Sequence, residues 1–219
     1  MAAYLVINLS PRPKGTSAML SRQCAEYLKN QGKTACVMGL YKHLNDLSVL
    51  LEAAREADAL VFVGPCYLNT YPADTYRLLE ALCASETDCA NKRVYAMIQG
   101  GMPYAHTHEN GLTAVRLFAK QCGAQYMGGF AMGLGPLVDG SSLDKLPHAK
   151  KVKRAIAEFY AHIANLTWAP DSLYLKVQLS TPPMLGFVLT KFMNRGRRKD
   201  FEAHGIDYKQ PNPYLAVDQ

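Results

Sequence analysis

The residues best suited to chemistry lie in one short stretch near the amino terminus, "SPRPKGTS". It combines hydroxyl groups, a cation able to bind a phosphate through two parallel hydrogen bonds, and a glycine that lets a ligand approach the backbone closely. A plain connector needs no cations, whereas a phosphate site uses every one of these groups. The stretch therefore predicts a phosphate-binding loop built by Ser10, Arg12, Gly15, Thr16 and Ser17.

Two further stretches carry groups suited to a planar ligand. The stretch "PCYLNTYPADT" (65–75) is stiffened by two prolines and offers tyrosines, a leucine and an asparagine, which suit the edge of a heteroaromatic ring. In "QGGMPYAHTHEN" (99–110), Gly100 and Gly101 would let backbone amides approach a ligand and stabilise negative charge on a reduced ring. The same stretch contains side chains that could reach a bound substrate, Tyr104, His106 and His108.

The elements that must position these stretches follow from the pattern of apolar residues. Short, nearly continuous apolar runs predict buried parallel strands, and stripes at helical spacing lie between them. The predicted strands are Tyr4–Leu9, Thr34–Leu40, Ala59–Gly64, Val94–Ile98 and Gln125–Met132. This alternation predicts an α/β fold of three layers, with a five-stranded parallel sheet and helices on both faces, in the flavodoxin-like order 2-1-3-4-5.

Ligands of such sheets bind beyond the carboxyl ends of the strands. The three stretches follow the first, third and fourth predicted strands, so we expect them to meet at one edge of the sheet.

The sequence lacks the residues that other known kinds of phosphate-binding site require. The stretch after the first strand has one glycine, which excludes the dinucleotide-binding and P-loop motifs. The Cys–Arg spacing of low-molecular-weight tyrosine phosphatases and the acidic cluster of response regulators are also missing.

Composition limits the remaining classes. The chain has 219 residues, 49% hydrophobic and 19% charged, which is ordinary for a soluble globular protein. The net charge of +6 comes without a nucleic-acid motif, so we expect no nucleic-acid partner. The six cysteines form no CxxC pair, and we expect reduced thiols and no metal site. Without a signal peptide or an apolar run long enough to span a bilayer, we expect a cytoplasmic protein.

The carboxyl-terminal region departs from the alternating pattern. We expect one domain over residues 1–166 and an extension over 167–219, with a strand or extended arm at Leu173–Leu179 and a helix at Met184–His204. An arm that packs on the core or on a partner subunit is the simplest interpretation. The helix begins apolar and continues with "NRGRRK", so contact with a membrane surface is the alternative.

At residues 4–165 the sequence resembles the flavodoxin-like NAD(P)H-dependent oxidoreductases that bind FMN, which include FMN reductases and, more distantly, quinone and azo reductases. The resemblance rests on "SPRPKGTS", "PCYLNTYPAD" and the glycine pair after the fourth strand. It implies that the first loop holds the FMN phosphate and that Gly100 and Gly101 lie at one edge of the flavin. The other edge would be lined by Pro65, Cys66, Tyr67, Leu68 and Asn69. Leu9 stands where many relatives have glycine.

The resemblance also implies an activity. Hydride would pass from NADH or NADPH to FMN, and on to a quinone, a nitro or azo compound, or a flavin. That chemistry belongs to the flavin, so no protein nucleophile or metal is expected, and members of the family are often homodimers. Two alternatives stay open, a flavodoxin-like electron carrier and an FMN-binding regulatory protein without turnover. The positive net charge and the spelling of the first loop disfavour the carrier.

Overall fold

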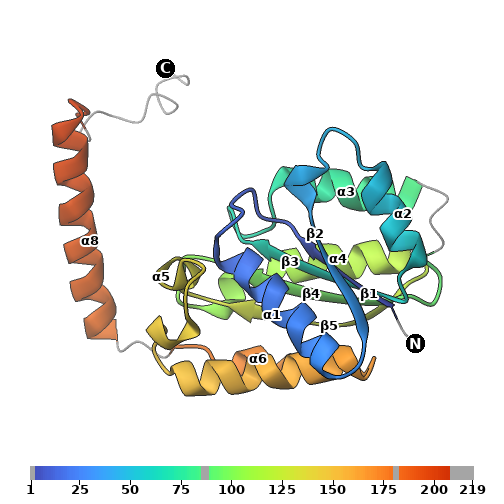
Figure 1. Ribbon diagram of the computed structural model, residues 1–219. Coiled ribbons are helices and arrows are strands. Elements are labelled where there is room, and N and C mark those ends of the chain that lie inside the picture. Colours follow the sequence, from blue (N-terminus) through green and yellow to red (C-terminus); the bar gives the residue numbers. More distant parts are fainter. Residues whose placement is uncertain (1–2, 85–88, 180–182, 208–219) are drawn as a thin grey trace. The chain divides into compact units, whose positions relative to one another are not determined.

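Five parallel strands form the centre of the fold in this computed structural model, which describes residues 3–84, 89–179 and 183–207. They pair in the order β2-β1-β3-β4-β5, as predicted from the sequence (Figure 1). Their bounds are Ala3–Asn8 (β1), Thr34–Gly39 (β2), Ala59–Pro65 (β3), Arg93–Gln99 (β4) and Gln125–Met132 (β5). The pairs β1–β2, β1–β3 and β3–β4 are all parallel and each keeps one continuous register, so the carboxyl ends of these strands lie at one edge of the sheet.

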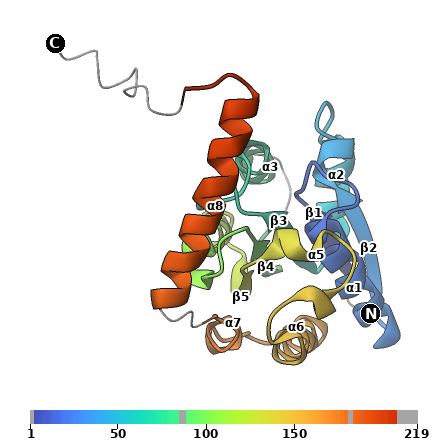
Figure 2. The same ribbon diagram turned by 90° about the vertical axis from the view of Figure 1, so that its left-hand side faces the viewer.

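Helices cover both faces of the sheet (Figures 1 and 2). On one face α1 (Thr16–Asn30) contacts α6 (Ala149–Ala164), and on the other α3 (Ala73–Ala84) contacts α4 (Glu109–Gln121), with α2 (Ser48–Glu56) beside them. Shorter helical turns complete this part, η1 (Leu40–Lys42), η2 (Ala105–His108), α5 (Gly135–Val138), η3 (Leu143–Lys145) and α7 (Ser172–Leu175). The flavodoxin-like three-layer fold expected from the sequence is therefore confirmed.

The core explains why the strand sequences are nearly all apolar. Every residue of β3 is buried because helices cover both faces of the central strand. Aromatic side chains tie the sheet to the helices, as where Phe62 of β3 meets Phe118 of α4 edge to face, with ring centroids 5.6 Å apart. Such packing fixes the ends of the strands, and with them the loops that carry polar groups.

The compact unit that contains the sheet runs from Met1 to Leu179, beyond the boundary at residue 166 that we expected. Residues 173–179 do not form the expected strand or extended arm. They begin within α7, where Leu173 and Tyr174 are buried and the Tyr174 ring meets Phe130 of β5. Burying these two adjacent side chains stabilises the short helix on the core.

The second unit, 180–219, contains α8 (Pro183–Ala203). This helix confirms the one expected at Met184–His204, and residues 208–219 of the expected extension lie outside the described residues. Several of its apolar side chains are exposed, among them Met184, Phe187 and Phe192. Lys191 lies over the Phe187 ring, 5.4 Å from its centroid. Within the described parts of the chain, no helix is long and apolar enough to cross a bilayer.

Candidate functional site

One pocket lies at the carboxyl edge of the sheet and collects the three stretches singled out in the sequence. Its empty volume is about 430 Å³, including the open solvent at its mouth. Residues after β1, β3 and β4 line it together with a fourth group after β5 that the sequence did not indicate. The lining residues are Ser10, Arg12, Gly15, Thr16, Pro65, Cys66, Tyr67, Gln99, Gly100, Gly101, Gly135, Pro136 and Asp139.

The loop after β1 is shaped by hydrogen bonds between residues that are close in sequence. The Ser10 amide donates to Asn8 Oδ1 at 3.1 Å, and the Arg12 amide donates to Ser10 Oγ, also at 3.1 Å. The Gly15 amide then donates to the Arg12 carbonyl at 3.3 Å, which turns the chain into α1. No side chain caps this helix, and the N–H groups of a first helical turn have no partners within the helix. They are suitable donors for an anion.

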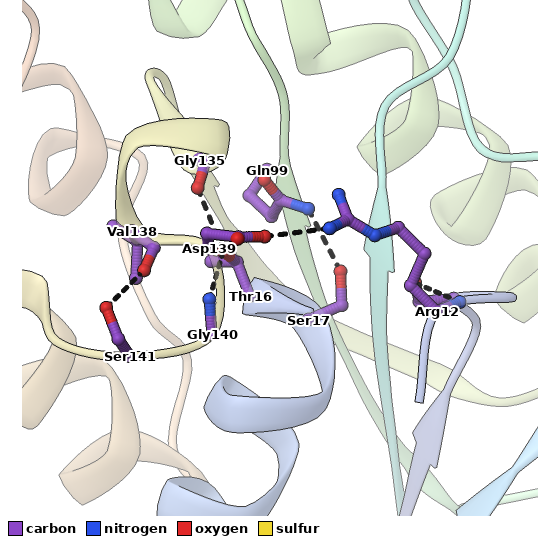
Figure 3. Close-up of polar contacts among 10 residues, drawn as sticks. Arg12, Thr16, Ser17, Gln99, Gly135, Val138, Asp139, Gly140 and Ser141 are labelled. Atoms are coloured by element: carbon purple, nitrogen blue, oxygen red, sulfur yellow. Dashed lines mark hydrogen bonds and ion pairs between the residues drawn. The ribbon is translucent and has the colours of Figure 1, made fainter. Parts of the chain in front are cut away.

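The two hydroxyl residues that open α1 differ in their access to the pocket. Thr16 Oγ1 lines it, but donates to the Gly135 carbonyl at 2.8 Å and accepts from the Gly140 amide at 3.2 Å (Figure 3). Ser17 is 1% exposed and lies behind the lining, where its Oγ accepts a hydrogen bond from Gln99 Nε2 at 3.1 Å. Both hydroxyls therefore hold the loops together, and Ser17 is not at the pocket surface.

The loop after β3 has one part in the pocket and one part that projects from the surface. Tyr67 and Thr70 pair as a two-residue hairpin, with N–H···O distances of 2.7 and 3.2 Å, and its tip residues Leu68 and Asn69 have φ values of 50° and 68°. Leu68 is 99% exposed, and neither tip residue is among those that line the pocket. Burial raises the pKa of the Cys66 thiol, so this pocket residue is protonated at neutral pH.

After β4, the two glycines serve different purposes. The Gly100 amide donates to the Met132 carbonyl at 3.0 Å, so it is engaged by β5 and not directed at a ligand. A Cβ atom at this position would lie 2.5 Å from His108 Cε1, so packing of the histidine requires a glycine there. Gly101 has open space instead, with Pro136 Cγ as the nearest atom at 3.8 Å from a Cβ. Of the pair, Gly101 is the one that leaves room for a ligand.

The aromatic residues that follow do not line the pocket. Tyr104 and His106 stack on each other, with ring centroids 5.6 Å apart and planes 23° apart, and neither is among the lining residues. His108 is 2% exposed, and its Nε2 lies 3.3 Å from the Met102 carbonyl oxygen. Burial lowers the pKa of His108, so its ring is neutral at pH 7 and supports Gly100 from behind.

Gln99 is a pocket residue that we did not single out from the sequence. It is the last residue of β4 and is 8% exposed, with its Nε2 bound to Ser17. Its Oε1 is buried and has no hydrogen-bond partner. A buried acceptor left unpaired is costly, and it suits a ligand that brings a hydroxyl donor. Its position between the end of a strand and a glycine pair was the signal available in the sequence.

The comparisons decide the family. Residues 3–136, which include the loops after β1, β3 and β4, match the family model of NADPH-dependent FMN reductases. The chain belongs to this family. Membership in this family makes the chain a flavin-dependent oxidoreductase and supports FMN as its cofactor. No curated protein sequence matches the chain.

Solved structures agree with the fold. An NADH:FMN oxidoreductase (EmoB) in its apo form superposes with a TM-score of 0.62 at 18% identity, over 80% of this chain and 94% of that one. An azoreductase from Bacillus anthracis str. Sterne gives a TM-score of 0.57 at 17% identity, over 76% of this chain and 100% of the other. A flavodoxin from Streptococcus pneumoniae TIGR4 gives 0.55 at 15% identity, with the same coverage. At these identities the likeness extends to the fold alone.

The pocket of this FMN reductase family member has the polar groups that FMN requires. A cation and the free amides of the first turn of α1 suit the phosphate, and the unpaired Gln99 Oε1 suits a hydroxyl of the ribityl chain. Pro65, Cys66 and Tyr67 offer a mostly apolar wall for the ring. We find no clustered metal ligands among the residues that the structure describes.

Proposed function

We propose that the chain transfers hydride from NADH or NADPH to a small electron acceptor through FMN bound in this pocket. The observation that carries the proposal is that stretches separated by more than eighty positions, at Ser10–Thr16 and at Gln99–Gly101, line one pocket. Their groups match a phosphate at one end and a planar ring at the other. When bound, FMN supplies the hydride chemistry.

The residues of the chain have the task of holding and orienting the cofactor. Arg12 and the first turn of α1 bind the phosphate, and Gln99 accepts a hydrogen bond from the ribityl chain. Pro65, Cys66 and Tyr67 contact the ring, and Gly101, which has no side chain, leaves space for the ligand beside it. We propose quinones, nitro or azo compounds, or free flavin as the acceptor, because a pocket without clustered charges on its apolar wall suits flat, weakly polar molecules.

We also propose a homodimer. Leu68 projects almost fully exposed from the hairpin beside the pocket. About half of the surface of the pocket residue Tyr67 is also exposed, as is about half of Met102, which follows the pocket residue Gly101. Apolar side chains at such positions are typical of contact surfaces. Light scattering on the purified full chain measures the mass directly, and a mass of 24.2 kDa would contradict the dimer.

The test of the proposed activity is spectroscopic. The purified chain is mixed with FMN, separated from the free cofactor, and its visible spectrum is recorded before and after anaerobic addition of NADH or NADPH. We expect a yellow protein that is bleached by at least one nucleotide and recovers its colour with a quinone. A protein that retains no FMN contradicts the assignment. A yellow protein that neither nucleotide bleaches supports a carrier or a regulatory protein instead.

A further inference from the structure

The cation assigned to the phosphate site already has an anionic partner. Arg12 Nη2 donates to Asp139 Oδ1 at 2.8 Å, as Figure 3 shows. Both side chains are largely exposed, at 64% and 59%, and both line the same pocket. The pair therefore stands at the mouth of the pocket, where a ligand phosphate competes with the carboxylate for the guanidinium.

The backbone fixes the carboxylate at this place. Asp139 directly follows α5 and has a φ of 44°, and the next residue, Gly140, has a φ of 70°. The Gly140 amide donates to Thr16 Oγ1 at 3.2 Å, and a Cβ atom on Gly140 would lie only 1.9 Å from the Lys14 carbonyl oxygen. The loop after β5 is thus packed directly against the loop after β1. The backbone of Asp139 is therefore held beside the loop that carries Arg12, which keeps its carboxylate within reach of that cation.

We propose that Asp139 determines how strongly the site takes phosphate-bearing ligands, because a phosphate must displace its carboxylate from Arg12. The inference rests on the proposed function in placing the FMN phosphate at this loop. An exposed ion pair is weak, whereas a phosphate can engage the guanidinium with two hydrogen bonds, so displacement is feasible. The displaced carboxylate stays near the phosphate and repels it. Asp139 therefore lowers the affinity for FMN but not for riboflavin, which has no phosphate.

The opposite role makes the opposite prediction. A carboxylate that only oriented Arg12 for a phosphate would strengthen the binding of FMN, and its removal would weaken that binding. The sign of the change in affinity therefore separates the two roles. Asparagine is a suitable replacement because it has nearly the same shape, carries no charge and tolerates the left-handed backbone of this position.

The experiment uses the full chain and three probes, which are inorganic phosphate, FMN and riboflavin. Affinities for FMN and riboflavin are measured by flavin fluorescence, and that for inorganic phosphate by calorimetry. For Asp139→Asn we expect the Kd for FMN and for phosphate to fall about ten-fold, as removal of a like charge a few ångströms away implies. The Kd for riboflavin changes less than about two-fold, since no phosphate is involved. Asp139→Gly, which also permits the positive φ, gives the same pattern.

The matched control is Asp144→Asn. Asp144 is also an exposed carboxylate in an ion pair, with Lys153 Nζ at 2.6 Å, but it lies outside the residues that line the pocket. We expect the Asp144→Asn variant to leave all three affinities unchanged, because the net charge of the chain alone does not account for the effect of Asp139→Asn. Circular dichroism melts establish that each variant is folded.

The outcomes also separate this inference from the proposed function. If FMN binds the parent chain and Asp139→Asn leaves its Kd unchanged or raises it, the role of Asp139 is overturned while the flavin function stands. If neither flavin binds the parent chain but Asp139→Asn tightens inorganic phosphate, the flavin function fails and Asp139 keeps its role. Equal phosphate affinities in both proteins, with no flavin bound, overturn both.

Discussion

At the residue scale, Leu9 shows why a departure from a family pattern need not disturb the site. Leu9 is fully buried, and its amide donates to the Val63 carbonyl at 2.8 Å, which continues the pairing of β1 with β3. A Cβ atom on Gly64 would lie 2.9 Å from Leu9 Cβ and 2.7 Å from the Tyr71 ring. The leucine thus occupies space that a glycine on the neighbouring strand leaves free. Its bulk faces the core and leaves the phosphate loop as it is.

The same scale shows what the sequence could not reveal about the site. Hydroxyl, cationic and glycine residues identified the loop after β1, but their partners depend on side chains far away in the chain. Ser17 is bound by Gln99, and Arg12 by Asp139, across 82 and 127 positions. Gly100 is explained by the packing of His108 and not by a ligand. Residue types predict which groups are available, whereas only the folded contacts show which of them are already engaged.

Gln99 gives a prediction that separates binding from stability. Gln99→Leu removes the buried acceptor that has no partner together with the hydrogen bond to Ser17, and the two effects on folding oppose each other. We expect the free energy of unfolding to change by less than about 1 kcal/mol. The Kd for FMN should rise at least about five-fold, as loss of one hydrogen bond to the ribityl chain implies. Urea unfolding and fluorescence titration measure the two quantities, and an unchanged Kd would remove Gln99 from the binding site.

His108 predicts how stability depends on pH. Burial lowers its pKa in the folded chain below the ordinary value of 6.5, so below that pH the unfolded chain binds more protons than the folded one. The free energy of unfolding should therefore decrease as the pH falls below about 6.5, by up to about 1.4 kcal/mol per pH unit from this group. Urea unfolding at pH 5 to 8 tests this against His108→Gln, in which the decrease should be smaller. Identical pH profiles would contradict it.

At the scale of elements, the apolar pattern was sufficient to predict the sheet and three of the four loops at its edge. Near-continuous apolar runs specify strands buried on both faces, and their alternation with helices predicts a parallel sheet. The presence of five such strands then favours the order 2-1-3-4-5. The loop after β5 was missed because it offers no cluster of ligand-binding residues. Its part in the site comes from its contact with the loop after β1, where Thr16 is bonded to both Gly135 and Gly140. A contact between two loops leaves no periodic signal in either of them.

Gly140 tests the importance of this contact between loops. Gly140→Ala places a Cβ atom 1.9 Å from the Lys14 carbonyl oxygen at a φ of 70°, so the two loops must separate. Gly32→Ala is the matched control, because Gly32 has a φ of 71° but nothing within 4 Å of its Cβ position. The control should lose about 1–2 kcal/mol of stability from the left-handed backbone alone. Gly140→Ala should lose about 1–3 kcal/mol more from the clash.

The readouts for this pair are urea unfolding and FMN titration. Separation of the loops also removes the hydrogen bond from the Gly140 amide to Thr16, so the Kd for FMN should change in Gly140→Ala and stay constant in Gly32→Ala. Equal losses of stability in the two variants would show that the loop after β1 does not depend on the loop after β5.

At the scale of the whole molecule, the pattern of strands and helices predicts a domain end at residue 166, whereas the compact unit continues through α7 to Leu179. The segment that leads to α7 is tied to β5, where the Ala169 amide donates to the Met127 carbonyl at 2.7 Å. Gly128 has a φ of 115°, and a Cβ atom there would lie 2.2 Å from the Ala169 carbonyl oxygen. A glycine in the last strand thus accommodates a segment that the sequence pattern assigns to an extension. We propose Leu179 as the end of the flavin-binding domain.

Two truncations decide between the boundaries. A chain of residues 1–166 lacks Leu173 and Tyr174, which are 1% and 4% exposed, and it uncovers Phe130 of β5. Burial of two large side chains is worth about 1.5–3 kcal/mol each, so this chain should lose at least about 3 kcal/mol of stability or fail to fold. A chain of residues 1–179 keeps these contacts, since they all lie within the compact unit Met1–Leu179. Its free energy of unfolding should stay within about 1 kcal/mol of that of the full chain, well below the cost of uncovering the core.

Urea unfolding followed by circular dichroism measures both truncated chains on one scale, and FMN titration adds an independent readout. The pocket is lined by residues between Ser10 and Asp139, so the chain of residues 1–179 should bind FMN with the Kd of the full chain. Any fold that the chain of residues 1–166 retains should bind it more weakly, because β5 carries the loop whose Gly135 carbonyl accepts a hydrogen bond from Thr16 at the start of α1. If both truncated chains match the full chain in stability and in affinity, α7 is dispensable and the domain ends at residue 166.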